Sequence, residues 1–488
     1  MEDDDIEELK GVLLIMEKKL LFGDRIDRYF DEMKEDLKKL VSIPSVCDTD
    51  SDVKPFGQPC RDALDYILMR ARDFGLITSV TDYYAGDARY GDGDEYADIL
   101  THLDVVPAGS GWDTAPFEAV EKGGKLFGRG TADDKGAAVA ALYALRALKD
   151  ADVKGRRCLR AVFGCGEEIG SEDLTVYYEK NGYPAAGFTP DCSYGICNSE
   201  KGILRIHLEA PHKEEQNILS FQAGTAVNAV PSEAQAWIRY TEEAWTKIQE
   251  IIRNKESGLT AELTQEVPEG TGLESAIHLF QRGKAAHGAE PELGVNAASL
   301  LLQVLKEVLG ADKIGTLPAF AADRIGMEYN GQSLGIRKSD EPSGDLTLNL
   351  GIVSIGKEKD QMDLDIRYPV TAQKDPIMTG IRQAASQYGV AVSEANHMAP
   401  LYVPEDSAQI RILSEAYEAV TGEKCDIFST GGGTYARHAD NKVVAFGPVF
   451  SDQEPTNAHG PNEFLDLERF REHCRICLEA AYRLLIME

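Results

Sequence analysis

The sequence predicts an α/β protein with a mostly parallel central sheet, into which a second, α+β domain is inserted. Before about residue 200, short apolar segments alternate with helix-like segments of roughly 10 to 15 residues, a pattern typical of parallel α/β units. Between 201 and 396 the pattern changes to strands of alternating polarity with fewer helices. After Pro400 the α/β pattern returns and ends in a predicted C-terminal helix.

Each element is predicted from hydrophobic periodicity and its boundaries. Apolar residues at helical spacing predict two N-terminal helices, the second ending at Ile43-Pro44-Ser45. Ile238-Arg239-Tyr240 and Ile366-Arg367-Tyr368 each close an alternating strand before a helix-like stretch, which indicates two similar halves in the middle region. The expected helices are 6–22, 26–42, 60–74, 135–149 and 407–421, and the expected strands are 97–101, 159–163, 204–209, 234–240, 346–350 and 443–446.

These changes of pattern divide the chain into a main domain and an insertion. The main domain is expected at 1–200, with a helical extension at 1–25, and again at 397–488. The inserted, pseudo-duplicated domain is expected at 201–396. In parallel sheets, ligands bind beyond the carboxyl ends of the strands, so the residues that follow each strand are the candidates for function.

Composition excludes several classes of partner. The chain has 51 Lys and Arg against 82 Asp and Glu, a net charge of −31, which disfavours nucleic acid and anionic lipid surfaces. No segment approaches the ~18 to 20 apolar residues of a membrane-spanning helix, and the acidic start Met1-Glu2-Asp3-Asp4-Asp5 is unlike a secretory signal. Nine dispersed cysteines do not indicate a disulfide framework, so we expect a cytoplasmic protein.

A set of imidazole and carboxylate side chains follows the predicted strands. Taken singly, a His-x-Asp or Glu-Glu pair is more often a capped turn or a solvated surface feature, but joint placement at one sheet edge favours a metal site. Imidazole and carboxylate suit Zn²⁺, with Mn²⁺ or Co²⁺ as alternatives, and a bridging carboxylate favours two ions about 3.5 to 4 Å apart. The candidates are His102, Asp104, Asp133, Asp134, Glu167, Glu168, Asp191 and His459.

Several ordered motifs resemble one family of metallopeptidases. The stretches from Ile99 to Phe117, Gly128 to Gly136 and Gly166-Glu167-Glu168 are similar to the di-zinc aminoacylase, carboxypeptidase and dipeptidase family, and most similar to PepV-type bacterial dipeptidases. The resemblance runs from about residue 27 to the C-terminus. It also includes the motifs around Asp191, Asn198 to Gly202, His287, Arg367, Gly431 to Thr434 and His459.

The resemblance implies roles for the candidate ligands. It implies that Asp133 bridges two Zn²⁺ ions, that His102 and Asp191 complete one site, and that Glu168 and His459 complete the other. Asp134 is then a neighbour of the bridging ligand. Asp104 is expected to accept the proton of the other ring nitrogen of His102 and so to fix its tautomer.

The resemblance also implies catalytic and substrate-binding residues. Glu167 is expected to act as the general base on a water molecule whose pKa the two ions lower, and His287 to stabilise the oxyanion. The guanidinium of Arg367 can hold the C-terminal carboxylate of a dipeptide, since it offers a fork of donors. Further substrate contacts are expected from Asn228 and from the loop residues Gly432, Gly433 and Thr434.

These expectations lead to one leading hypothesis and two alternatives. The leading hypothesis is a zinc-dependent dipeptidase acting on dipeptides with free termini, β-alanyl ones among the candidate substrates. The resemblance to PepV-type dipeptidases implies that the inserted domain acts as a lid whose two halves imitate the partner subunit of dimeric relatives, so we expect a monomer and turnover that depends on lid closure. The alternatives are a related amide hydrolase, such as an aminoacylase or carboxypeptidase, and a non-catalytic peptide-binding protein.

Overall fold

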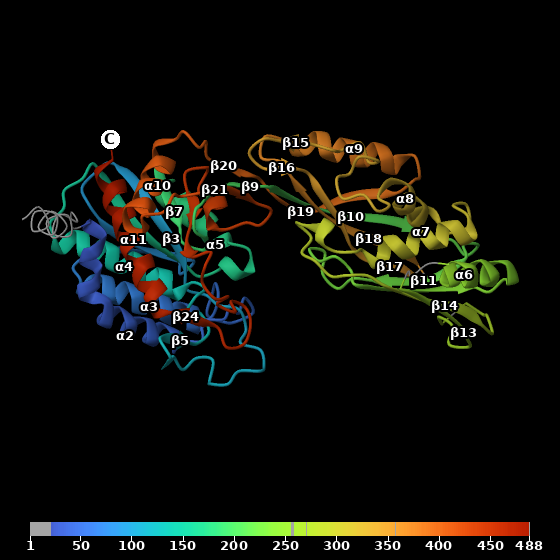
Figure 1. Ribbon diagram of the computed structural model, residues 1–488, viewed down its shortest axis with the longest axis horizontal. Helices are drawn as coiled ribbons and strands as arrows, with labels where there is room; N and C mark the ends of the chain where they lie inside the picture. Colours follow the sequence, from blue (N-terminus) through green and yellow to red (C-terminus); the bar gives the residue numbers. More distant parts are fainter. Residues whose placement is uncertain (1–20, 255–257, 270, 357, 488) are drawn as a thin grey trace, which may run out of the picture. The chain divides into compact units, whose positions relative to one another are not determined.

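A computed structural model describes residues 21–254, 258–269, 271–356 and 358–487 of the chain. The expected helix at 6–22 and most of the extension at 1–25 lie outside these residues. The chain divides into two compact units, and Figure 1 labels many of their helices and strands. The first unit holds the residues up to Asn198, Val403–Phe428 and the residues from Thr434 onward; the second holds Ser199–Tyr402 and Ser429–Gly433.

The first unit is built on a mixed sheet whose centre is parallel, as predicted. The strands follow the order β1-β2-β6-β3-β7-β22-β9, and the pairs β6/β3, β3/β7 and β7/β22 are parallel, whereas both edges are antiparallel. All eight residues of β6 are buried, as expected of a central strand covered on both faces. The strands are β1 (Ile77–Thr81), β2 (Ala85–Tyr90), β3 (Glu95–His102), β6 (Arg157–Gly164), β7 (Ala186–Thr189), β9 (Ile196–Glu200) and β22 (Val444–Phe446).

Helices pack around this sheet. The alanine-rich α4 packs on β3 and β6 and is buried on nearly all sides, because α11 and α2 cover its outer surface. α3 packs against β1 and β2. No helix in the described ranges is long and apolar enough to cross a membrane. The helices are η1 (Phe22–Tyr29), α2 (Phe30–Val41), α3 (Gln58–Asp73), α4 (Lys135–Asp150), η2 (Glu167–Ile169), α5 (Glu172–Asn181), α10 (Ala408–Thr421), η4 (Tyr435–His438) and α11 (Leu467–Ile486).

Short strands complete the first unit and also lie where the chain passes from the first unit into the second. The chain enters the second unit within β9, with which β20 and β21 pair. The remaining short strands are β4 (Val120–Lys122), β5 (Lys125–Phe127), β8 (Cys192–Ser193), β20 (Leu401–Tyr402), β21 (Ile427–Thr430), β23 (Pro448–Val449) and β24 (Phe464–Asp466).

The second unit is one antiparallel sheet with helices packed on it. The strands lie in the order β13-β14-β12-β11-β17-β18-β10-β19, so the antiparallel pair β11/β17 is at the centre of the sheet. β12 (Glu233–Arg239) precedes α6 (Glu242–Asn254), and β18 (Lys359–Tyr368) likewise precedes α9 (Lys374–Ser386). The two similar halves expected from the repeated Ile-Arg-Tyr triplet are therefore visible in the topology.

Aliphatic residues of both halves form one core in the second unit, with Leu204, Ile238 and Leu364 almost fully buried. α7 packs on β12 and β14, and α8 packs on β10. The other elements are β10 (Gly202–Pro211), β11 (Ile218–Ala223), β13 (Leu259–Thr264), β14 (Ala276–Arg282), η3 (Pro291–Leu293), α7 (Ala297–Leu309), α8 (Thr316–Arg324), β15 (Ser339–Asp340), β16 (Gly344–Asp345), β17 (Thr347–Gly356) and β19 (Ala391–Met398).

One predicted helix differs in form from the expectation. The segment 26–42 is not a single α-helix: η1 is a 3-10 helix that ends at Tyr29, and α2 begins at Phe30. The first part is held by tertiary contacts with α11, since the Gly23 N–H bonds the Glu479 carboxylate at 3.0 Å and Asp27 pairs with Arg475. The spacing of apolar residues in the sequence does not indicate contacts of this kind between distant segments.

Candidate metal centre

Three loops meet at one edge of the first sheet. β3 ends at His102, β6 leads into Glu167 and Glu168, and β7 is followed by Asp191. Because β6, β3 and β7 are adjacent and parallel, their carboxyl ends bring these side chains to the same edge. Asp133 reaches it from the loop before α4.

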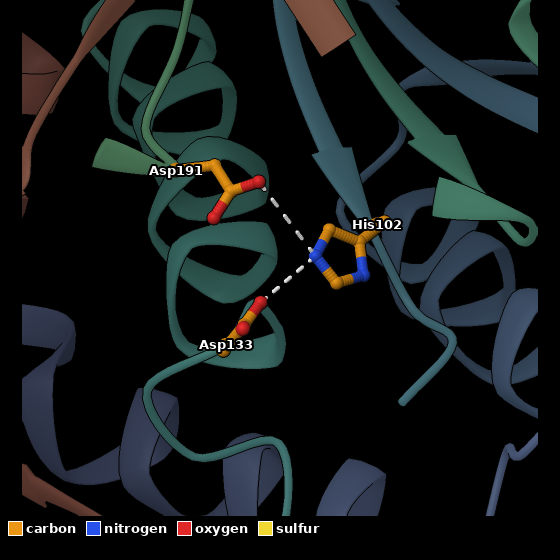
Figure 2. Close-up of side chains that lie close together, drawn as sticks. All are labelled: His102, Asp133 and Asp191. Carbon is orange, nitrogen blue, oxygen red and sulfur yellow. Dashed lines mark hydrogen bonds and ion pairs between the residues drawn. The ribbon is translucent and has the colours of Figure 1, made fainter. Parts of the chain in front are cut away.

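A first group of possible metal ligands comprises His102, Asp133 and Asp191 (Figure 2). His102 Nε2 lies 3.0 Å from Asp133 Oδ1 and 3.9 Å from Asp191 Oδ2. One nitrogen and two carboxylate oxygens therefore converge, all within 4.8 Å of one another. Imidazole and carboxylate at this separation suit a small divalent cation.

A second group comprises Asp133, Glu168 and His459. His459 Nε2 lies 3.0 Å from Asp133 Oδ2 and 3.2 Å from Glu168 Oε1. Asp133 therefore belongs to both groups and presents one carboxylate oxygen to each histidine. A carboxylate shared in this way could serve as a ligand in either group.

The electrostatics of the site also suit cations. Burial raises the pKa of Asp191 well above its usual value, and the nearby Asp133 adds to the effect. Hydrogen bonds to Asp133 and Glu168 raise the pKa of His459 to about 10. In the absence of metal, protons must therefore offset a concentration of negative charge that divalent ions would otherwise neutralise.

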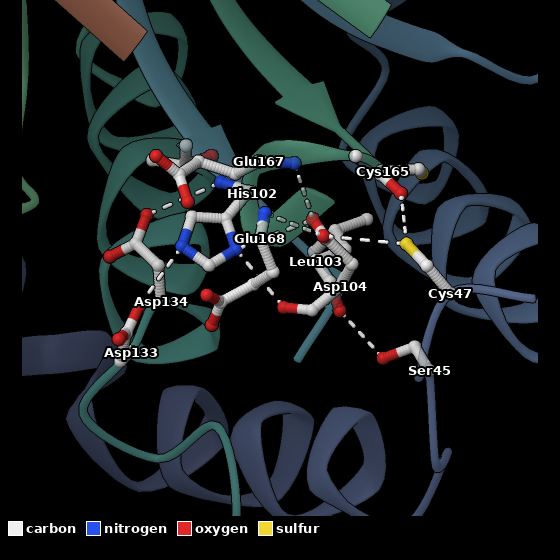
Figure 3. A network of polar contacts seen from close by, with 12 residues as sticks. Ser45, Cys47, His102, Leu103, Asp104, Asp133, Asp134, Cys165, Glu167 and Glu168 are labelled. Atoms are coloured by element: carbon white, nitrogen blue, oxygen red, sulfur yellow. Dashed lines mark hydrogen bonds and ion pairs between the residues drawn. The ribbon is translucent and has the colours of Figure 1, made fainter. Parts of the chain in front are cut away.

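Asp104 contacts the site differently from the sequence-based expectation (Figure 3). His102 Nδ1 lies 3.0 Å from the backbone carbonyl oxygen of Asp104 and 3.4 Å from its carboxylate. The carboxylate instead accepts the backbone N–H groups of Glu167 and Glu168, at 3.2 and 3.1 Å. Asp104 thus orients the imidazole mainly through its main chain and the Glu-Glu turn through its side chain.

Glu167 lies beside the ligand groups in the same turn as Glu168. Burial raises the pKa of Glu167 to about 7 in the absence of metal; His102 opposes this rise, and the carboxylate of Glu168 increases it. The peptide bond between Asp133 and Asp134 in the neighbouring loop is cis.

Sequence reasoning missed Asp173, which is fully buried beneath the same turn. Its Oδ2 accepts the backbone N–H groups of Cys165 and Gly166 at 2.8 and 2.9 Å, and also the hydroxyl of Tyr435. Together with Asp104, it satisfies the four consecutive N–H groups of residues 165–168. An isolated acid early in a helix carries no sequence signal for this role.

Asn228 and His287 lie together in the second unit. The backbone oxygen of Asn228 accepts the Gly288 N–H at 2.7 Å, and the half-buried Asn228 thus flanks the exposed His287. The Ala289 N–H donates to His287 Nδ1 at 3.2 Å. In a neutral ring this bond places the proton on Nε2, so that Nε2 is the donor.

Arg367 and the glycine-rich loop adjoin this pair. Arg367 is 3% exposed; its Nε and Nη2 bond the Asp365 carboxylate at 3.1 and 2.8 Å, and its Nη1 bonds the Gly431 carbonyl at 2.7 Å. Each terminal nitrogen of the guanidinium carries two N–H groups, and these bonds use only one on Nη1 and one on Nη2. The second N–H group on each nitrogen is not used in them. Gly431 also lies against Ala289. Gly431 thus contacts both Arg367 and Ala289, the residue whose N–H bonds His287.

The other predicted loop residues are divided between the units. Gly432 and Gly433 belong to the second unit and Thr434 to the first. The Gly432 N–H bonds the hydroxyl of Thr430 at 3.0 Å, and the Thr434 hydroxyl caps η4 through the Ala436 N–H. Gly433 is exposed.

Sequence reasoning also missed Asn349, which is almost fully buried in β17. Its side-chain amide donates to the carbonyls of Val227 and Ala229, at 3.0 and 2.9 Å. These two residues flank Asn228, so Asn349 fixes the backbone on both sides of it.

Comparison with known proteins gives consistent matches along the chain. The family model described as Peptidase family M20/M25/M40 matches residues 99–483. A Staphylococcus saprophyticus protein named "Putative dipeptidase" is 33% identical, over 96% of this chain and 100% of that protein. A Bacillus subtilis protein with the same description is 32% identical, over 93% of this chain and 97% of that protein.

Solved structures share the fold at low sequence identity. An aminoacylhistidine dipeptidase from Vibrio alginolyticus has a TM-score of 0.58 at 13% identity, covering 93% of this chain and 97% of that one. Human carnosine dipeptidase 1 has a TM-score of 0.57 at 15% identity, covering 95% of this chain and 98% of that one.

Proposed function

Because the chain belongs to peptidase family M20/M25/M40, we propose that this peptide-bond hydrolase is a metal-dependent dipeptidase that cleaves dipeptides with free termini. The observation that carries the proposal is the carboxylate of Asp133, which lies 3.0 Å from both His102 Nε2 and His459 Nε2 and so joins two groups of ligands. The relatives named as dipeptidases match nearly the whole chain, which supports this substrate class.

Two divalent ions, Zn²⁺ in the first instance with Mn²⁺ or Co²⁺ as substitutes, fit the donor set. His102, Asp133 and Asp191 would hold one ion, and Asp133, Glu168 and His459 the other. When bound, such ions lower the pKa of a water molecule and polarise the scissile carbonyl. Asp104 keeps His102 in the tautomer that presents Nε2 to the ion, since the Asp104 carbonyl accepts the Nδ1 proton.

Glu167 is the proposed general base. Its carboxylate takes a proton from the attacking water and delivers it to the departing amine, a role that requires a fixed position beside the ligand groups. Asp104 and Asp173 provide that position, because their carboxylates hold the backbone of the turn. Glu168, the next residue, is occupied as a ligand in this scheme.

The second unit is proposed to recognise the substrate. His287 Nε2 donates to the oxyanion that develops on the scissile carbonyl, since Ala289 holds Nδ1 as an acceptor. The N–H groups of Arg367 that Asp365 and Gly431 leave available bind the C-terminal carboxylate. Asn228, Gly432, Gly433 and Thr434 supply further contacts to the substrate.

Replacement of Glu167 tests the mechanism. Glu167→Gln keeps the shape of the side chain but removes its basicity, so kcat should fall by roughly 10² to 10⁴. Zinc content should stay at two ions per chain by elemental analysis. The control is Glu172→Gln, an exposed residue in the first turn of α5, which should keep full activity. Full activity of Glu167→Gln would exclude Glu167 as the base.

A substrate panel tests the substrate class. Free dipeptides, including β-alanyl ones, should be cleaved, whereas N-acetylated amino acids and longer peptides should be poor substrates. Preference for acetylated amino acids would identify an aminoacylase, and preference for longer peptides a carboxypeptidase. Absence of hydrolysis with two zinc ions bound would indicate a non-catalytic peptide-binding protein.

We also propose a cytoplasmic monomer. The continuous pairing of β11 with β17 joins two similar halves within one chain, and thereby supplies both halves without a second subunit. Light scattering on the purified protein should give one chain per particle, and fractionation of the source cells should place it in the cytoplasm. A dimeric mass would contradict the first part of this proposal.

A further inference from the structure

Arg129 and Glu463 form a buried ion pair in the first unit. Arg129 Nη1 lies 2.6 Å from Glu463 Oε2, and the two side chains are 2% and 0% exposed. Buried ion pairs of this kind often contribute little net stability, because desolvation opposes the attraction. The pair therefore calls for an explanation other than general stabilisation.

The Glu463 carboxylate binds the loop that leads to Asp133. It accepts the backbone N–H groups of Gly130, Ala132 and Asp133, at 3.0, 2.9 and 3.2 Å. Gly130 has φ +85°, and a Cβ there would lie 2.8 Å from Val105, so glycine suits this turn. Glu463 thus fixes the backbone that presents the shared carboxylate.

The same pair holds the turn that carries His459. Arg129 Nη2 donates to the carbonyl of Gly460 at 3.1 Å, and the Gly128 N–H bonds the carbonyl of Glu463 at 3.0 Å. His459 itself is 57% exposed and has φ +63°, a backbone conformation that L-residues rarely adopt. Little packing therefore restrains this histidine, and the bonds to its neighbours must do so.

We propose that Arg129 and Glu463 are positioning residues that hold Asp133 and His459 at the separation required by the cation of the second ligand group. The inference rests on the proposed metal-dependent function. His102 and Asp191 of the first ligand group come from other segments, which follow β3 and β7. Because Asp133 belongs to both groups and His459 to the second only, loss of the pair disturbs one ligand of the first group and two of the second, and should weaken binding of the second ion more than binding of the first.

Zinc binding tests the inference on the full-length protein. Wild type and Glu463→Gln are equilibrated with Zn²⁺ at a series of buffered free concentrations, and bound zinc is measured by elemental analysis. Wild type should bind two ions per chain. Removal of a partner outside the ligand set typically weakens metal affinity by about 10 to 100-fold. In Glu463→Gln we expect this weakening for one of the two ions. Bound zinc should therefore show a plateau near one ion per chain at free Zn²⁺ concentrations where wild type binds two.

The matched control is another fully buried ion pair in the same unit. Asp98 pairs with Arg160 at 2.7 Å, both side chains being 0% exposed. Within the described part of the chain, their other hydrogen bonds go to Tyr178 and to the carbonyls of Asn181 and Gly182, away from the loops that carry the proposed ligands. Asp98→Asn should lower thermal stability but leave both zinc affinities within about twofold of wild type. This control separates the general effect of breaking a buried ion pair from the specific effect of breaking the pair between Arg129 and Glu463.

The outcomes distinguish this inference from the proposed function. Wild type that binds no zinc would overturn the proposed function. Wild type that binds two ions, with Glu463→Gln indistinguishable from it, or with Glu463→Gln and Asp98→Asn each losing both ions to the same extent, would overturn only the role of the pair. If Glu463→Gln fails to fold, the same zinc measurements are made on Arg129→Lys and interpreted in the same way. A lysine lacks the two terminal nitrogens through which Arg129 bonds both Glu463 and Gly460.

Discussion

The hydroxyl of Tyr435 donates a hydrogen bond to the buried carboxylate of Asp173, beneath the turn that carries the proposed general base. The Tyr435 ring also meets the imidazole of His102 edge to face, with centroids 6.0 Å apart. One phenol thus adjoins both a proposed ligand and the support of the Glu167 turn. Its loss should disturb the position of catalytic groups without removing any of them.

We therefore expect Asp173→Asn to lower kcat by roughly 10²-fold, because a displacement of about 1 Å in a catalytic group has an effect of this size. KM should change little, since Asp173 is fully buried and is not one of the proposed substrate contacts. Tyr435→Phe should have a smaller effect in the same direction. Steady-state kinetics on a dipeptide measures both.

The control for these variants is Tyr177→Phe, which removes another buried tyrosine bond, the one to Asp87 at 3.0 Å. It should cost about 1 kcal/mol of stability and leave kcat unchanged. Equal losses of kcat in Tyr435→Phe and Tyr177→Phe would show that Asp173 and Tyr435 act only on stability.

Metal stoichiometry should differ between ligand variants. Asp133→Asn alters the carboxylate common to both groups, so zinc content should fall towards zero. His459→Asn alters one group only and should leave about one ion per chain. Elemental analysis after gel filtration in chelator-free buffer measures this. The same stoichiometry in both variants would exclude Asp133 as a shared ligand.

Arg367 should determine the preference for a free C-terminus. Arg367→Lys cannot keep the bonds to Asp365 and Gly431 and also hold a carboxylate, so kcat/KM for dipeptides should fall by roughly 10 to 100-fold. Dipeptide amides, which lack the carboxylate, should be poor substrates for wild type and little affected by the substitution. An equal loss on both substrates would place the effect elsewhere.

Stability should fall on acidification because of His473. Burial lowers the pKa of His473 to about 3; its Nδ1 bonds the Tyr194 hydroxyl at 2.8 Å, and its Nε2 has no hydrogen-bond partner among the described residues. Above the unfolded pKa of about 6.5 the imidazole is neutral in both states. Below it, only the unfolded state takes up the proton, so unfolding is favoured as the pH falls towards 3.

His473→Asn tests this dependence. Between pH 7.5 and 5.5, His473 should account for about 1.4 kcal/mol of lost stability. Urea unfolding at the two pH values should therefore show a smaller loss in the variant than in wild type by about that amount. Parallel pH dependence in the two proteins would exclude His473 as the titrating group.

The sequence predicted the parts of the fold that depend on local pattern. Apolar periodicity located α3 and α4 to within two residues, and strand positions placed His102 and Glu168 at one sheet edge. It could not predict Asp173 or Glu463, since each is a single acid that accepts backbone N–H groups, and no pattern in the sequence marks such a bond. Nor could periodicity distinguish η1 from an α-helix, because contacts with α11 hold that segment.

The order of residues along the chain has a consequence for synthesis on the ribosome. Asp133 and Glu168 are made early, the second unit follows, and His459 and Glu463 emerge near the end. A nascent chain arrested at any earlier point lacks one histidine of the proposed centre and the carboxylate that binds the loop of Asp133. Prematurely terminated translation products are therefore expected to be inert towards peptides in the cell that makes them.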